Sequence, residues 1–202
     1  MITLYHSPQS RSVRPRWVLE EVGAPYTIEK IDLQAGTQRQ ADYLRLNPNG
    51  TVPTLVDGDL VLWESAAIVQ YLADKFPAAR LAPPVGTPAR GTYYQWVHYA
   101  MSTIETPTVA IFVHTVQRPE ATRIPQLVDE SRQQLAKALA VVDAALAGKP
   151  YLLGAEFSAA DVMVGSTLWW CRAMGLVGDR PNVNDYVERL GQRPAMQRAL
   201  AD

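Results

Sequence analysis

The first third of the chain alternates short apolar runs, typical of strands, with stretches that repeat apolar residues at helical spacing. Ile2-Thr3-Leu4-Tyr5 predicts a buried strand, Ser12 to Val22 predicts a helix that ends at Gly23, and Tyr26 to Ile31 predicts a second strand. A strand, a helix and a strand in this order imply a parallel pair with a right-handed crossover. This part of the chain is therefore predicted to be an α/β domain.

The pattern continues with a short helix and a hairpin. Gln38 to Leu46 has helical spacing, and Thr54-Leu55-Val56 and Leu60-Val61-Leu62 flank Asp57-Gly58-Asp59, a strong turn signal between antiparallel strands. A helix from about Ser65 to Phe76 follows, and Pro77 ends it. The predicted order is β-α-β-α-β-β-α, which is the thioredoxin-like order.

The pattern changes after Pro77. Pro83, Pro84, Gly86 and Thr87 form a stretch that cannot sustain a helix, so we predict a thioredoxin-like domain over residues 1–77, a linker over 78–88 and a second domain over 89–202. The second domain is predicted to be all-helical, because apolar residues recur at helical spacing in Ala89 to Val116, Ile124 to Ala147, Ser158 to Met174 and Asn184 to Leu190. Ser158-Ala159-Ala160-Asp161 has the pattern of a capping box, and Arg193-Pro194-Ala195 predicts one more helix start.

Composition and charge narrow the function classes. The 202 residues are 48% hydrophobic and 19% charged, as in ordinary globular proteins, and the formal net charge of -1 gives no bulk field for nucleic acid or anionic lipid. No apolar run approaches the roughly 20 residues that span a bilayer, so we expect no membrane insertion and a cytoplasmic location. The single Cys171 and three scattered His residues predict neither a disulfide nor a metal site.

Two places in the first domain carry patterns with more than one interpretation. Val52-Pro53 precedes the third strand; it is either a turn or, if the bond is cis, a strand edge whose Val52 backbone pairs with a peptide-like ligand. Glu64-Ser65 stands where the fourth strand gives way to a helix. Ser65 is either an N-cap or part of a site for an anion such as an α-carboxylate.

The loop after the first strand is rich in hydroxyl groups. In Ser7-Pro8-Gln9-Ser10-Arg11-Ser12, the hydroxyls of Ser10 or Ser12 either cap the following helix or present a donor to a ligand. Pro15 would then fall in the first helical turn, where its missing N–H is tolerated, and this favours capping for Ser12.

Taken together, these motifs resemble those of the soluble glutathione transferase superfamily over nearly the whole chain, with the serine-type bacterial members as the nearest match. The matching pieces are the serine-rich turn, Asn47-Pro48-Asn49-Gly50-Thr51-Val52-Pro53, Glu64-Ser65-Ala66-Ala67-Ile68 with Tyr71-Leu72, the Ser158 to Asp161 capping box and Arg193-Pro194-Ala195. The resemblance implies that Val52 makes antiparallel backbone bonds to the cysteinyl part of glutathione beside a cis Pro53. It also implies that Glu64 and Ser65 hold the γ-glutamyl end, with Ser7 and Thr51 among the other glutathione-binding residues.

The resemblance further implies that a hydroxyl in the serine-rich turn stabilises the glutathione thiolate. Ser10 is the favoured donor, with Ser12 and Ser7 as alternatives, and Arg11 is expected to assist with its charge. Tyr5 is expected inside the first strand and is not favoured. The implied reaction is transfer of glutathione to a hydrophobic electrophile, without a metal, in a homodimer.

The second substrate is expected to lie against the long helix of the second domain. The residues proposed to line its site are Tyr93, Trp96, Tyr99, Ala100, Met101, Thr103 and Glu105. Two alternatives remain open. One is a glutathione-dependent isomerase, dehalogenase or peroxidase on the same fold, and the other is a non-catalytic interaction module.

Overall fold

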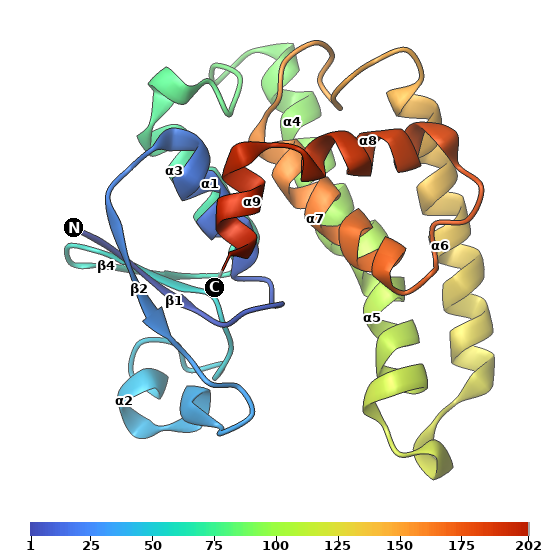
Figure 1. Cartoon of the computed structure of the whole chain (residues 1–202), viewed down its shortest axis with the longest axis horizontal. Helices are drawn as coiled ribbons and strands as arrows, with labels where there is room; N and C mark the ends of the chain where they lie inside the picture. Colours follow the sequence, from blue (N-terminus) through green and yellow to red (C-terminus); the bar gives the residue numbers. More distant parts are fainter. Residues whose placement is uncertain (202) are drawn as a thin grey trace. The chain divides into compact units, whose positions relative to one another are not determined.

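The computed structural model describes residues 1–201, which form two compact units (Figure 1). The first unit contains Met1–Ala82 together with residues 191–201, and the second contains Pro83–Leu190. The first unit holds the sheet and the second holds most of the helices, so the expected combination of a thioredoxin-like domain and a helical domain is confirmed.

The first unit is built on a mixed sheet of four strands in the order β2-β1-β3-β4. The strands are β1 (Ile2–His6), β2 (Tyr26–Lys30), β3 (Thr54–Asp57) and β4 (Leu60–Trp63). β1 pairs in parallel with β2 and antiparallel with β3, and β3 pairs antiparallel with β4 through the predicted turn. Gly58 has a φ of 61° in that turn, a conformation that glycine adopts at little cost.

Helices cover both faces of this sheet. α1 (Val13–Val22) packs against α3 (Ser65–Lys75), and the alternating residues Ile2, Leu4 and His6 of β1 are buried on that side. On the other face, Tyr5 packs against Tyr43 of the short helix α2 (Ala41–Leu44), with ring centroids 5.6 Å apart. A 3₁₀ turn, η1 (Thr37–Arg39), precedes α2, and another, η2 (Pro77–Ala79), follows α3.

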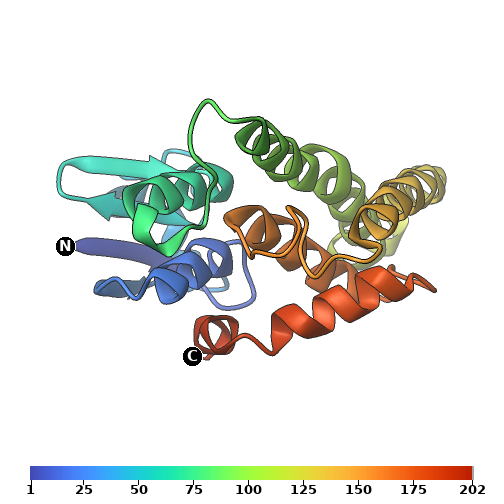
Figure 2. The same ribbon diagram turned by 90° about the horizontal axis from the view of Figure 1, so that it is seen from above.

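The last helix, α9 (Pro194–Leu200), lies beside α1 in both views (Figure 1 and Figure 2). The Arg193 guanidinium donates to both carboxylate oxygens of Glu21, at 2.7 and 2.8 Å, and Arg198 donates to Glu20 at 2.6 Å. Sequence reasoning placed this segment in the second domain. These ion pairs join segments far apart along the chain, which is why α9 groups with the first unit instead.

The second unit consists of helices that pack around α7. Its elements are α4 (Pro88–His98), α5 (Thr106–Phe112), the 3₁₀ turn η5 (Glu120–Thr122), α6 (Pro125–Leu146), α7 (Ala159–Ala173) and α8 (Pro181–Gly191). α7 is buried along most of its length, as expected for a helix that is apolar nearly all round. The Ser158 N–H donates to Asp161 Oδ2 at 2.8 Å, so the predicted capping box at the start of α7 is confirmed.

The long helix predicted over Ala89 to Val116 is not continuously α-helical. Two π-helical segments, η3 (Tyr99–Glu105) and η4 (Val113–Gln117), flank α5. Pro107 explains the first of them, because its ring has no N–H and clashes with the carbonyl four residues earlier, which favours a wider turn.

Candidate functional site

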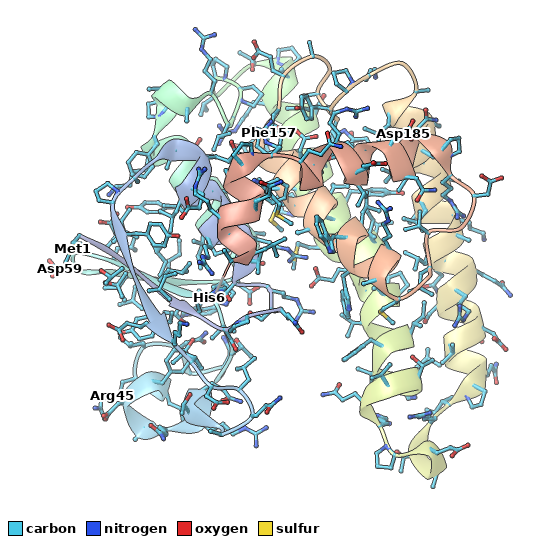
Figure 3. The ribbon with its side chains drawn as sticks, in the orientation of Figure 1. Met1, His6, Arg45, Asp59, Phe157 and Asp185 are labelled. Carbon is cyan, nitrogen blue, oxygen red and sulfur yellow. The ribbon has the colours of Figure 1, made fainter. Side chains whose placement is uncertain are left out.

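The serine-rich turn joins the carboxyl end of β1 to α1 in the first unit, and His6 stands at that end of the strand (Figure 3). Gln9 has a φ of 54°, so the loop turns sharply before Ser10. Ser10 is half-buried, whereas Ser12 is fully buried. The turn therefore presents the Ser10 hydroxyl nearer the surface and keeps the Ser12 hydroxyl inside.

Hydrogen bonds hold both hydroxyls in place. Ser10 Oγ donates to the Ser7 carbonyl at 2.7 Å and lies 2.7 Å from Ser12 Oγ. Ser12 Oγ also accepts from the Ser7 N–H at 3.1 Å and lies 2.7 Å from His6 Nδ1. A hydroxyl fixed this way loses little conformational entropy when a ligand takes one of its bonds.

The expectation that Ser12 caps α1 with its side chain is wrong. Ser12 occupies the N-cap position, but its side chain makes no capping bond to the helix. Its backbone is helical, with a φ of -70° and a ψ of -13°, instead of the extended conformation of an N-cap. The hydroxyl points back to Ser7 and His6, where it fixes the turn.

Two arginines in the first turn of α1 are buried, and sequence reasoning did not select either as a site residue. Arg14 is 3% exposed and donates to Ser65 Oγ at 3.1 Å, and Arg16 is 8% exposed and donates to His6 Nε2 at 3.3 Å. Cations are unfavourable at the amino end of a helix because of the helix dipole. Two arginines in an otherwise apolar first helical turn are therefore unusual, and this pattern could have identified Arg14 and Arg16 as candidate site residues.

The Asn47 to Pro53 loop lies before β3, and its shape depends on buried side chains. Asn47 is 1% exposed and donates to the Thr51 carbonyl at 2.8 Å, and the Tyr43 hydroxyl donates to the same carbonyl at 2.6 Å. The Val52–Pro53 peptide bond is cis. Val52 is 9% exposed, and neither its N–H nor its C=O has a hydrogen-bond partner within residues 1–201.

Glu64 and Ser65 lie where β4 ends and α3 begins. Glu64 is exposed and has a φ of 73°, a left-handed conformation that non-glycine residues adopt rarely and mostly for a structural or functional reason. Ser65 is 2% exposed, and Arg14 fixes its hydroxyl from α1. The first turn of α3 therefore has a buried cation beside it, which favours an anionic ligand.

Gln38 is a further candidate that sequence reasoning missed. Gln38 is 8% exposed, its amide nitrogen donates to the Leu33 carbonyl at 3.4 Å, and its Oε1 has no partner within residues 1–201. A Cβ at Gly50 would lie 3.2 Å from the Gln38 carbonyl, so η1 and the Asn47 to Pro53 loop are in close contact. A buried acceptor without a partner is unfavourable unless a ligand or water supplies the donor.

The residues expected to line the second-substrate site lie in the second unit and differ in exposure. Tyr93, Trp96, Ala100 and Glu105 are buried, Tyr99 and Met101 are half-buried, and Thr103 is exposed. The Tyr99 hydroxyl donates to the Ala138 carbonyl at 3.3 Å. Met101 and Thr103 are thus the more accessible of the set, and the role of every member stays a prediction.

Residues 1–201 contain no group of three or more His, Cys, Asp or Glu side chains placed to hold a metal ion. No helix among them is long and apolar enough to cross a membrane.

Comparison with known proteins agrees with this geometry. Residues 1–74 match the family model "Glutathione S-transferase, N-terminal domain", and residues 125–189 match "Glutathione S-transferase, C-terminal domain". The chain is 34% identical to Glutathione S-transferase 3 of Zea mays, over 99% of this chain and 93% of that protein. It is 33% identical to Glutathione S-transferase GstB of Escherichia coli (strain K12), over 99% of this chain and 98% of that protein.

Solved structures show the same likeness over the whole chain. A bacterial GST, BphK, solved as a ternary complex, is 33% identical with a TM-score of 0.87, over 98% of this chain and 97% of that one. A sphingomonad glutathione S-transferase complexed with glutathione is 31% identical with a TM-score of 0.85, over 98% of this chain and 96% of that one. With both family models and full-length relatives in agreement, the chain belongs to the glutathione S-transferase family.

Proposed function

We propose that this protein binds glutathione in the first unit and transfers it, as the thiolate, to hydrophobic electrophiles. The observation that carries the proposal is the Ser10 hydroxyl, half-buried in the turn before α1 and held there by hydrogen bonds to Ser7 and Ser12. Ser10 acts as a hydrogen-bond donor to sulfur and does not attack the substrate.

The energies agree with this role for Ser10. A free thiol has a pKa of about 8.5, and lowering it by ~2 units requires ~2.7 kcal/mol of differential stabilisation. One hydrogen bond to a charged group contributes roughly 1.5–3 kcal/mol, and the amino end of a helix contributes about 0.3–1 kcal/mol. The Ser10 hydroxyl and the dipole of α1 together therefore suffice, without a metal ion or a general base.

The remaining glutathione contacts follow from the available polar groups of the first unit. The backbone of Val52, beside Pro53, pairs with the cysteinyl part of glutathione, and the exposed Glu64 with Ser65 holds the γ-glutamyl group. Ser7 and Thr51 flank these contacts, and Arg11, which is exposed, adds positive charge near the thiolate.

The electrophile is expected to contact the second unit through Met101 and Thr103, the accessible members of the predicted set. We expect the active form to be a homodimer, as the family resemblance implies, and we propose a cytoplasmic location on the basis of the sequence alone.

Glutathione binding and conjugation test the proposal together. Calorimetry measures glutathione binding, and a chromogenic aryl halide measures transfer, for the wild-type protein and Ser10→Ala. Ser166→Ala is the matched control, because that hydroxyl donates to a carbonyl of its own helix in the second unit. We expect binding in all three proteins and a loss of transfer of about tenfold or more in Ser10→Ala only. A wild-type protein that does not bind glutathione contradicts the proposal, and binding without transfer supports the non-catalytic module.

A further inference from the structure

A chain of hydrogen bonds connects Ser10 to the interior of the first unit. Ser10 Oγ lies 2.7 Å from Ser12 Oγ, and Ser12 Oγ lies 2.7 Å from His6 Nδ1. His6 Nε2 in turn accepts from the Arg16 guanidinium at 3.3 Å. His6 is fully buried, and each of its two ring nitrogens takes part in this chain of bonds.

Arg16 fixes the tautomer of His6. A guanidinium has donors and no acceptor, so the His6 Nε2 that faces Arg16 carries no proton. A neutral imidazole has one N–H, and that proton is therefore on Nδ1, from which it donates to Ser12 Oγ. Arg16 is itself held by the Ala201 carbonyl, to which its other terminal nitrogen donates.

The tautomer of His6 decides which bonds Ser12 can make. A hydroxyl has one proton and two acceptor positions. The His6 Nδ1–H and the Ser7 N–H fill both acceptor positions of Ser12 Oγ. Ser12 thus cannot accept a proton from Ser10, and it directs its own proton to Ser10 Oγ at 2.7 Å or to the Ser7 carbonyl at 3.0 Å.

This arrangement leaves the Ser10 proton for a ligand. In the turn, the Ser10 hydroxyl donates to the neutral Ser7 carbonyl, and a thiolate is the stronger acceptor because it is charged. With the opposite tautomer, Ser12 would donate to His6 and would have an acceptor position free. Ser10 would then donate to Ser12, and its proton would be turned away from sulfur.

We propose that His6 is a positioning residue for the thiolate. Held by Arg16 with its proton on Nδ1, it occupies the acceptor position of Ser12 and so leaves the Ser10 proton for the sulfur of glutathione. The inference rests on the proposed function of Ser10, and His6 itself touches neither the thiol nor the electrophile.

The pKa of the bound thiol, read from the ultraviolet absorbance of the thiolate, separates this role from a purely structural one. His6→Leu removes the donor, and His6→Asn keeps an amide N–H at the place of Nδ1. We expect the thiol pKa to rise by about 0.5 to 1 unit in His6→Leu, a loss of thiolate of about three- to tenfold at pH values below the pKa. In His6→Asn it should stay within about 0.3 units of wild type, and in both variants the Kd for glutathione should stay within about twofold.

A second measurement needs no variant. The ¹⁵N chemical shifts of the His6 ring in the wild-type protein report the tautomer directly, and we expect a protonated Nδ1 and a bare Nε2. A proton on Nε2 overturns the inference, as does an unchanged thiol pKa in His6→Leu or an equal rise in both variants. If glutathione does not bind, or Ser10→Ala leaves the thiol pKa unchanged, the proposed function fails. If those two tests succeed and the His6 tests do not, only this inference fails.

Discussion

Asp161 is a buried carboxylate that stabilises the second unit, and we expect its removal to lower the free energy of unfolding strongly. Its side chain is fully buried at the start of α7. Oδ1 accepts from the Leu152 N–H and the Tyr186 hydroxyl, each at 2.9 Å, and Oδ2 accepts from the Ser158 N–H at 2.8 Å and its hydroxyl at 2.9 Å. Burial raises the pKa of Asp161, and the hydrogen bonds oppose that shift without cancelling it.

The magnitude follows from the donors that Asp161→Ala would leave without an acceptor. Two N–H groups and two hydroxyl groups, at about 1 kcal/mol each, predict a loss of about 3–5 kcal/mol. For a chain of this length that loss corresponds to a fall in Tm of about 6 to 20 °C. Asp161→Asn keeps one acceptor oxygen, so we expect a smaller loss of about 1–2 kcal/mol.

Thermal unfolding followed by circular dichroism measures the effect. Asp185→Ala is the control, because Asp185 is exposed on α8 of the same unit (Figure 3), and its removal should change stability by less than about 0.5 kcal/mol. If Asp161→Ala melts within about 2 °C of wild type, or if Ala and Asn cost the same, the reasoning from unpaired donors is wrong.

Three further predictions concern the reactivity of Cys171, the substitution of two glycines and the role of Arg14. Burial raises the pKa of Cys171 to about 11. We therefore expect a disulfide reagent to label no thiol in the native protein and one thiol after unfolding. Rapid labelling of the folded protein would contradict this. Gly23 has a φ of 65° at the end of α1, so Gly23→Ala should cost about 1 kcal/mol in urea unfolding. Gly91→Ala, inside α4 with nothing within 4 Å of the new Cβ, should instead stabilise by about 0.5–1 kcal/mol. Arg14→Met removes the donor to Ser65, so the Kd for glutathione should rise about tenfold while the pKa of the bound thiol stays unchanged; a shifted thiol pKa would place Arg14 at the sulfur instead.

The order of strands and helices in the first unit was predictable, because each element has a local signal. Period-two runs mark β1 and β2, the Asp57-Gly58-Asp59 turn marks the hairpin of β3 and β4, and Gly23 ends α1. The place of α9 was not predictable, since it depends on ion pairs with α1 across most of the chain. The π-helical segments were not predicted either, because the spacing of apolar residues does not distinguish an α-helical turn from a π-helical one.

The candidate site shows the same division between local and distant causes. Ser10, Val52 and Glu64 belong to local sequence motifs, and they could therefore be identified as candidates from the sequence. His6, Arg14 and Arg16 act through contacts that only the packing of α1 on β1 and α3 creates. Alternation along β1 predicts that His6 is buried, but no pattern in the sequence predicts that Arg16 and Ser12 meet its two ring nitrogens.

Titration of the glutathione thiol in the binary complex tests the role of Ser10 most directly. The absorbance of the thiolate is followed against pH for the wild-type protein and for Ser10→Ala. With the Ser10 hydroxyl and the dipole of α1 directed at sulfur, the wild-type complex should titrate at about 6.5 and the variant at about 8 or above. Titration of both complexes near about 8.5, the value of a free thiol, would contradict the account.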